Sequence, residues 1–322
     1  MVKKITAAAL FCLIAALLSL CLGAVPLTWQ AVLAGPGNTA GTIFWFVRLP
    51  RTAACLLAGS ALAVAGAVIQ NVLNNKLASP GIIGINAGAG LAVTVCCVLG
   101  FLSGWAVAGA AFLGAMTAAA LVVFLGQKTG ASRTTVILGG VAVNAFLNAL
   151  SEAVTRLFPE IAMLSVDFRV GGFSAVSLPR LVPAGILIML SLSAVLTLCN
   201  ELDVLSLGDE TARSLGLPVK RMRMIFLFMA AMLAGCAVSF AGLLGFVGLI
   251  VPHGARKIAG SESRYLLPLC ALGGAGFVTV CDTLCRIVFA PHELPVGIGM
   301  AALGGPFFLM ILLKQKGGRI NA

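Results

Sequence analysis

Charged residues are scarce in this chain: they make up 10% of its 322 residues, whereas 60% are apolar. Soluble globular domains carry about a quarter charged residues, so the composition excludes a soluble protein. It favours a protein of the lipid bilayer, in which roughly 20 apolar residues form one helical span. The sequence contains ten apolar stretches that can each form such a span. We therefore predict an all-α integral membrane protein, a bundle of about ten transmembrane helices.

Residues that carry chemistry are also few. The two histidines, His253 and His292, fall at opposite membrane faces of the predicted bundle, so they cannot jointly bind a metal. The ten cysteines show no CxxC spacing and no nearby histidine. We therefore expect them to pack as small apolar side chains within the helices. The sequence contains no GxxxxGK[ST] motif for a nucleotide and no convergent acid, base or metal cluster for an integral-membrane enzyme. We expect no catalytic residue, no metal site and no cofactor bound by this chain.

The predicted spans are joined mostly by short connections. Residues 159–180 are too polar for the hydrocarbon core, and residues 201–223 form the most charged stretch of the sequence. The ten spans are expected at 5–25, 52–72, 82–100, 104–126, 134–158, 181–200, 224–240, 242–255, 265–289 and 294–313.

The N-terminal apolar run after Lys3 and Lys4 has two other interpretations, a secretory signal and, because of Cys21, a lipoprotein signal. The run exceeds the 7 to 15 apolar residues of a signal core, and Leu20 is too large for lipoprotein processing. We interpret it as the first span. Both termini are then cytoplasmic, with 15 Lys and Arg inside against 6 outside. That asymmetry explains the net charge of +11 by the positive-inside rule and predicts a multi-pass protein of a bacterial inner membrane.

An ordered series of motifs follows in the C-terminal quarter, at residues 245–256, 282–286, 293–297 and 304–307. Their order and intervals resemble the permease subunits of BtuC/FecCD-type ABC importers, which carry ferric siderophores, haem or vitamin B12. The resemblance extends from about Arg48 to Lys316 and implies the fold of a type II importer permease, one domain over 1–322. The structural or gating residues that it implies are Gln70, Asn75, Pro80, Gly84, Pro252, His253, Arg256, Asp282, Glu293, Pro295 and Gly297.

The sequence departs from that family at two places. Lys76 stands where the family usually has proline, which predicts a less rigid inner loop. Phe168 precedes the pair Gly171-Gly172 where the family often has tryptophan.

Arg48 and Arg51 stand at the outer start of the predicted second span. Arginines at a helix end can simply anchor it at the membrane interface, with the guanidinium group reaching toward water. The resemblance instead implies that both, with Arg286, meet carboxylates of a substrate-binding protein. Asp282 and Arg286, four residues apart, can pair on one helix as a functional site or as a structural clamp, and both interpretations stay open.

The segment 207–218 predicts a short helix. It begins at Asp209 and Glu210 and stops at Gly216. Such an amphipathic helix between two spans either lies on the lipid interface or docks on a partner. The resemblance implies docking into a cytoplasmic ATPase. The coupling residues would be Gly208, Asp209, Ala212, Leu215 and Gly216.

The resemblance therefore implies the membrane subunit of an ATP-driven, binding-protein-dependent importer for an iron chelate, haem or cobalamin. Its expected partners are an ABC ATPase dimer that uses ATP and Mg, an extracytoplasmic binding protein, a second permease copy or paralogue, and membrane lipid; nucleic acid is not expected. The alternative is an ion-coupled secondary carrier, for which Glu152 and Asp282 are the candidate buried carboxylates. The sequence does not decide which cargo is carried or whether the permease forms a homodimer or a heterodimer. It also leaves open whether the binding protein is free or lipid-anchored.

Overall fold

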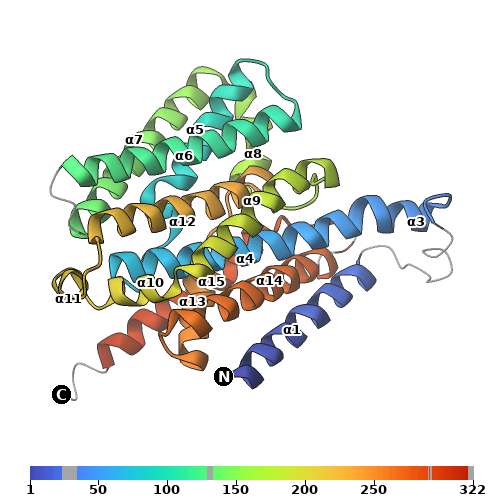
Figure 1. Cartoon of the computed structure of the whole chain (residues 1–322). Helices are drawn as coiled ribbons and strands as arrows, with labels where there is room; N and C mark the ends of the chain where they lie inside the picture. The colour runs from blue at the N-terminus through green and yellow to red at the C-terminus, as the bar shows by residue number, and fades with distance from the viewer. Residues whose placement is uncertain (24–34, 129–132, 289, 291, 318–322) are drawn as a thin grey trace.

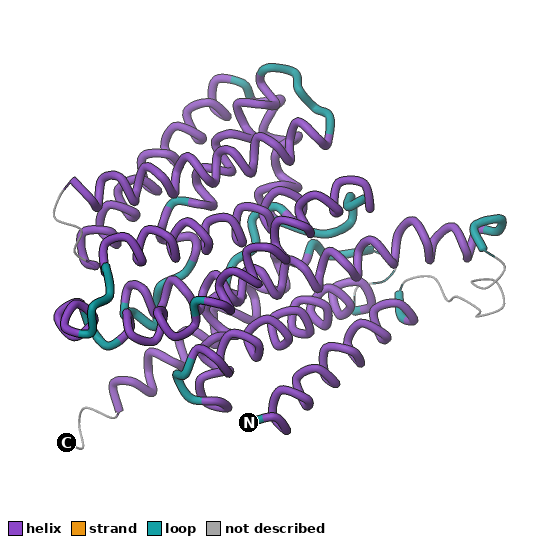
Figure 2. The backbone as a smooth tube through the Cα atoms, viewed as in Figure 1, coloured by secondary structure: helices purple, strands orange, loops and turns teal. Residues whose placement is uncertain are grey.

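The regular elements of the chain are helices in all the residues that the structure describes (Figure 2). The structure is a computed structural model, and it describes residues 1–23, 35–128, 133–288, 290 and 292–317, without the side chains of 311–317. Seven helices of these residues are long and apolar enough to cross a membrane. The prediction of an all-α membrane bundle is confirmed.

Helical segments fill nearly the whole described chain (Figure 1). They are α1 Val2–Cys21, α3 Thr39–Ile43, the π-helix η1 Phe44–Arg48, α4 Leu49–Leu73, the 3-10 turn η2 Pro80–Ile83, α5 Ile85–Val98, α6 Gly104–Lys128, α7 Arg133–Leu157, α8 Pro159–Val170, α9 Leu178–Thr197, α10 Cys199–Ser206, α11 Asp209–Ser214, α12 Val219–Ala241, α13 Val247–Ala259, α14 Ser263–Ile287 and α15 Val296–Gly317.

Each predicted span overlaps a helical segment, but several boundaries are wrong. The seventh starts at Val219 rather than 224. The second span belongs to a helical run over 39–73, so its helix starts well outside residue 52. The third is shortened to α5 because η2 and the left-handed Gly84 precede it. The eighth begins at Val247 rather than Gly242, after a loop that ends in a left-handed Phe246. The predicted span ends at 24–25 and 289 lie outside the described residues, as does Arg319 of the basic tail.

Helix α4 is the centre of the bundle. Figure 1 shows it crossing the middle of the molecule, and 21 of its 25 residues are buried. It packs against α14, α12, α13 and α9. A helix that is apolar on every side and surrounded by protein is the expected core of such a bundle.

Glycines bring α4 close to two of its neighbours. A Cβ atom on Gly59 would lie 2.2 Å from the carbonyl oxygen of Gly274 on α14, and a Cβ on Gly274 would lie 2.3 Å from that of Gly59. Gly66 meets Gly248 of α13 in the same way, at 2.1 Å. These helices therefore touch backbone to backbone, which is how small residues drive helix association in lipid.

The start of α1 and the end of α15 lie toward one end of the bundle. In Figure 1 the start of α1 and the end of α15 face the same side as α11. The Lys4 ammonium donates a hydrogen bond to the carbonyl of Ile258 in the last turn of α13, which joins the start of α1 to that end. This arrangement agrees with an even number of crossings.

Candidate functional site

A buried ion cluster joins the outer parts of α4 and α14. Arg51 donates from Nε to Asp282 Oδ2 at 3.0 Å and from Nη2 to Asp282 Oδ1 at 3.0 Å, a two-point contact. Its Nη1 bonds Glu293, just before α15, at 2.5 Å. Asp282 is fully buried and Arg51 is 5% exposed. Removing such charges from water is costly, so they persist only as a paired and hydrogen-bonded set.

Two further arginines extend this cluster to α1. Arg286 Nε lies 3.2 Å from Asp282 Oδ2 as an ion pair, and its Nη2 donates to Ser19 Oγ at 2.7 Å. Arg48 donates from Nη1 to the carbonyls of Leu20 and Cys21, at 3.0 and 2.7 Å. The orphan carbonyls at the end of α1 are thereby capped by a cation, the favourable sign for that end of a helix.

The three arginines thus face inward. Arg48, Arg51 and Arg286 are 4%, 5% and 3% exposed, and their guanidinium groups bind the chain's own oxygens. Of the two interpretations left open for Asp282 and Arg286, these contacts favour the structural clamp. The expected contact of these arginines with a binding protein stays a prediction. Because their side chains bind oxygens of this chain, we expect them to influence docking by shaping the surface rather than by touching the binding protein.

The start of α15 is held by the same cluster and by the loop between α8 and α9. Gly297 donates its N–H to the carbonyl of Gly171 at 3.1 Å, and a Cβ on Gly297 would lie 1.7 Å from the carbonyl oxygen of Val170. Glu293 and Pro295 line an outer cavity of about 450 Å³ with Gly171. The predicted gating residues of 293–297 therefore form one contact region.

A second polar cluster joins α4 to α13 near the inner end. The Arg256 guanidinium bonds the side-chain oxygens of Gln70 and Asn71. Gln70 Nε2 donates to the carbonyls of Gly248 and Ala78, at 2.9 and 3.1 Å. Because Gln70 is 2% exposed, these bonds satisfy polar atoms that would otherwise be costly in the bundle.

This inner cluster continues to α14 and α10. Asn71 Nδ2 bonds Ser263 Oγ at 3.2 Å. The backbone N–H of Ser263, at the start of α14, donates to both carboxylate oxygens of Asp203, at 2.9 and 3.1 Å. The first turn of α14 is therefore capped by a carboxylate from α10, the charge that a helix N-terminus favours.

The remaining predicted structural residues shape nearby turns. Asn75 accepts a hydrogen bond from the N–H of Leu77 at 2.9 Å, Pro80 begins η2, and Gly84 ends it with φ +86°. Pro252 lies inside α13, where His253 stacks edge-on against Phe307 of α15 with ring centroids 6.3 Å apart. The structural interpretation of His253 fits this aromatic contact.

Helix α11 is the predicted coupling helix, and it forms over Asp209–Ser214 between left-handed Gly208 and Gly216. Ala212 is fully buried. Leu215, expected on the same apolar face, is 62% exposed, as is Leu207. The apolar face is therefore divided: one side packs on the chain, and the other presents two leucines outward.

Asp209 fastens α11 to two spans. Its carboxylate accepts from Arg223 Nη2 of α12 at 2.6 and 2.8 Å and lies 3.0 Å from Arg133 Nη2 of α7. Partial burial raises the pKa of Asp209, but the hydrogen bond from Arg223 and the charges of Arg223 and Arg133 outweigh it and hold that pKa below its usual value. The carboxylate is ionised at neutral pH.

Sequence reasoning missed several partners in these clusters. These partners are Arg133, Arg223, Ser19 and Asp203. No local signal marks them, since Arg133 is 76 residues from Asp209 and Ser19 is 267 residues from Arg286. Among the described residues, no group of three or more His, Cys, Asp and Glu is placed to hold a metal ion.

Comparison with known proteins places this architecture in a family. The family model described as the FecCD transport family matches residues 11–314. The haemin transport system permease protein of Yersinia pestis is 33% identical over 302 residues, covering 92% of this chain and 90% of that protein. The vitamin B12 import system permease protein of Salmonella paratyphi A is 35% identical over 323 residues, covering 98% and 96%.

A solved structure has the same fold. It is described as an inward-facing conformation of a metal-chelate type ABC transporter, and it matches with a TM-score of 0.89 at 28% identity. The match covers 98% of this chain and 100% of that chain. The resemblance inferred from the sequence is confirmed.

The outer ion cluster gives a stability prediction. Asp282→Asn leaves Arg51 and Arg286 without their shared anion, and losing one member of a buried pair costs about 3–5 kcal/mol. Glu293→Gln is the matched control, since the Glu293 side chain is 40% exposed and such a pair contributes at most about 1 kcal/mol. Thermal unfolding in detergent should show a much larger fall in Tm for Asp282→Asn. Equal falls for both variants would contradict the clamp.

Proposed function

This chain belongs to the FecCD transport family, and from that premise we propose that it is the membrane-spanning subunit of an ATP-driven importer for an iron chelate, haem or cobalamin. ATPase subunits act on the side of α11, a binding protein delivers cargo at the opposite side, and a second copy or paralogue completes the pathway. The chain lies in a bacterial cytoplasmic membrane with both termini inside.

Helix α11 is the observation that carries this proposal. It is too short to be stable alone, yet it is fixed to α7 and α12 through Asp209 and presents Leu207 and Leu215 at 62% exposure. A lipid-resting helix would satisfy the leucines but would not need an ionic connection to two spans. A helix that transmits force from an ATPase needs both an apolar docking face and a stiff connection.

The inner contacts supply a route for that force. From α11, Asp209 leads to α7 and α12. The neighbouring α10 reaches α14 through Asp203 and Ser263, and α14 reaches α4 and α13 through Asn71 and Arg256. These are chains of hydrogen bonds between rigid helices, an arrangement that can carry coupling between distant sites.

The secondary-carrier alternative receives less support. It requires a buried carboxylate that can exchange ions, and Asp282 is committed to Arg51 and Arg286. Glu152, the other candidate, is exposed on α7. A carboxylate bound by two guanidinium groups has no open position for a coupling cation.

At the outer rim, we infer an indirect role for the buried arginines in docking the binding protein. Arg48, Arg51 and Arg286 hold the ends of α1, α4 and α14 and, through Glu293, the start of α15. Because these helix ends are fixed, the surface that they present to a binding protein is already ordered before docking. Less conformational entropy is then lost on association.

Uptake decides between the two functions. Vesicles that contain the chain with its co-purifying partners should accumulate one of labelled ferric siderophore, haem or cobalamin when ATP is supplied. Without ATP the same vesicles should show no uptake, even under a proton or sodium gradient. Uptake driven by an ion gradient in the absence of any ATPase would overturn the importer proposal.

Coupling through α11 has its own test. Leu215→Glu places a charge on the exposed docking face, so co-purification of ATPase subunits and ATP-dependent uptake should fall by roughly tenfold while Tm stays unchanged. Leu157→Glu is the matched control, since Leu157 is 75% exposed at the other end of α7. Full coupling in the Leu215 variant would contradict the docking role.

Docking can be checked with a charge-preserving change. Arg51→Lys keeps the cation but loses the two-point contact with Asp282, so binding-protein-stimulated ATPase activity should fall several-fold together with Tm. Arg169→Lys, at an exposed outer arginine, should leave both unchanged. Unaltered stimulation in the Arg51 variant, despite a lower Tm, would refute the positioning role.

A further inference from the structure

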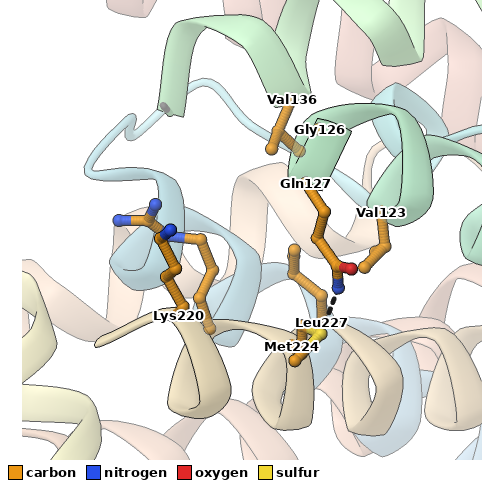
Figure 3. A pocket seen from close by; sticks show the side chains of 8 residues that line it. Val123, Gly126, Gln127, Val136, Lys220, Met224 and Leu227 are labelled. Atoms are coloured by element: carbon orange, nitrogen blue, oxygen red, sulfur yellow. Dashed lines mark hydrogen bonds between the residues drawn. The ribbon is translucent and has the colours of Figure 1, made fainter. Parts of the chain in front are cut away.

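A groove runs between α6 and α12 from their inner ends toward the middle of the bundle. It consists of two adjoining cavities of about 280 Å³ each. They share four lining residues and are therefore continuous: Val123, Gln127, Met224 and Leu227. Figure 3 shows the first cavity. Gln127 reaches from α6 to the sulfur of Met224, and Lys220 stands on another side of the same cavity.

The two halves of the groove differ in chemistry. The inner half is bordered by Lys220, Gln127 and Arg223. The other half is bordered beyond the shared residues by Met116, Ala119, Ala120, Phe124, Phe228 and Ala231. Ala120, Phe124 and Phe228 are exposed, so this half opens on the apolar surface of the chain.

The charge at the inner half is positive. No Asp or Glu is among the described residues that line either cavity. Lys220 is exposed at the start of α12 and is followed by exposed Arg221. On α6, Lys128 Nζ stands 5.1 Å from the ring centroid of Phe124, which brings a further cation to the groove.

We propose that this groove binds an anionic glycerophospholipid of the inner leaflet. Its phosphate would lie against Lys220 and Gln127, and one acyl chain would follow Ala120 and Phe228. An anion joined to a long apolar chain matches both halves, and basic pockets between membrane helices on the cytoplasmic side bind such headgroups. A free phosphate would occupy the inner half alone and would make no contact with the apolar half of the groove.

The groove lies next to the ion pair that holds α11, so a bound lipid can affect that helix. Arg223 lines the inner half and also holds Asp209 of α11. A bound phosphate therefore stands beside the ionic connection of the coupling helix and attracts the same guanidinium that Asp209 binds. The lipid acts as a structural ligand at the joint between α11, α7 and α12.

Lipid titration followed by native mass spectrometry tests the proposal on the purified complex. Palmitoyl-oleoyl phosphatidylglycerol should bind more tightly than the phosphatidylcholine with the same chains. Lys220→Gln should weaken phosphatidylglycerol by about fivefold, and Lys257→Gln, at an exposed inner lysine of α13, should not. Equal effects of the two lysine changes would overturn the site and indicate general surface attraction.

Three further results complete the test. Ala120→Phe fills the apolar half and should weaken both lipids, whereas Val141→Phe, on an exposed position of α7, should weaken neither. Inorganic phosphate at millimolar concentration should leave the bound lipid in place. Displacement by phosphate alone would show a free-anion site. Lipid bound by the permease without its ATPase subunits but absent from the complex would show a protein contact; either result would overturn the proposal.

Discussion

The pairing of Arg51 with Asp282 is the interaction on which the outer half of the bundle depends. Both groups are almost wholly buried, one on the central helix α4 and the other on α14. In a low-dielectric interior neither charge is tolerated alone. The pair therefore fixes the relative rotation of two helices whose glycines already touch, and Arg286 and Glu293 bring α1 and α15 to the same point.

The inner end is built differently. Its contacts link several helices through hydrogen bonds and ion pairs: Asp209 binds Arg223 and Arg133, Asp203 caps Ser263, and Arg256 binds Gln70 and Asn71. Asp209 and Arg256 are only partly buried, whereas Asp282 is fully buried. The end of the bundle near α11 is therefore the more accessible one, which suits a transporter if movement begins at α11.

Sequence reasoning predicted those features whose signals are local. Helix α11 followed from the acidic first turn at Asp209 and the stop at Gly216, and the approach of Arg286 to Asp282 followed from their spacing of four. The contact of Arg51 with Asp282 could not be predicted, because 231 residues separate them and any buried carboxylate would have served equally well. Hydropathy also made α5 too long and placed α13 four to five residues too early, since apolar loops such as the one before Val247 are indistinguishable from helix ends by composition.

The separation of Arg51 from its partner has a consequence for biosynthesis. At about 5–20 residues per second, the 231 residues between Arg51 and Asp282 take roughly 10–50 s to translate. During that time α4 has left the ribosome with its arginine and its glycine surfaces uncovered, because α13 and α14 do not yet exist. The contacts of α4 with α13 and α14 therefore form only when the last quarter of the protein is made, so the packing of the central helix is completed late.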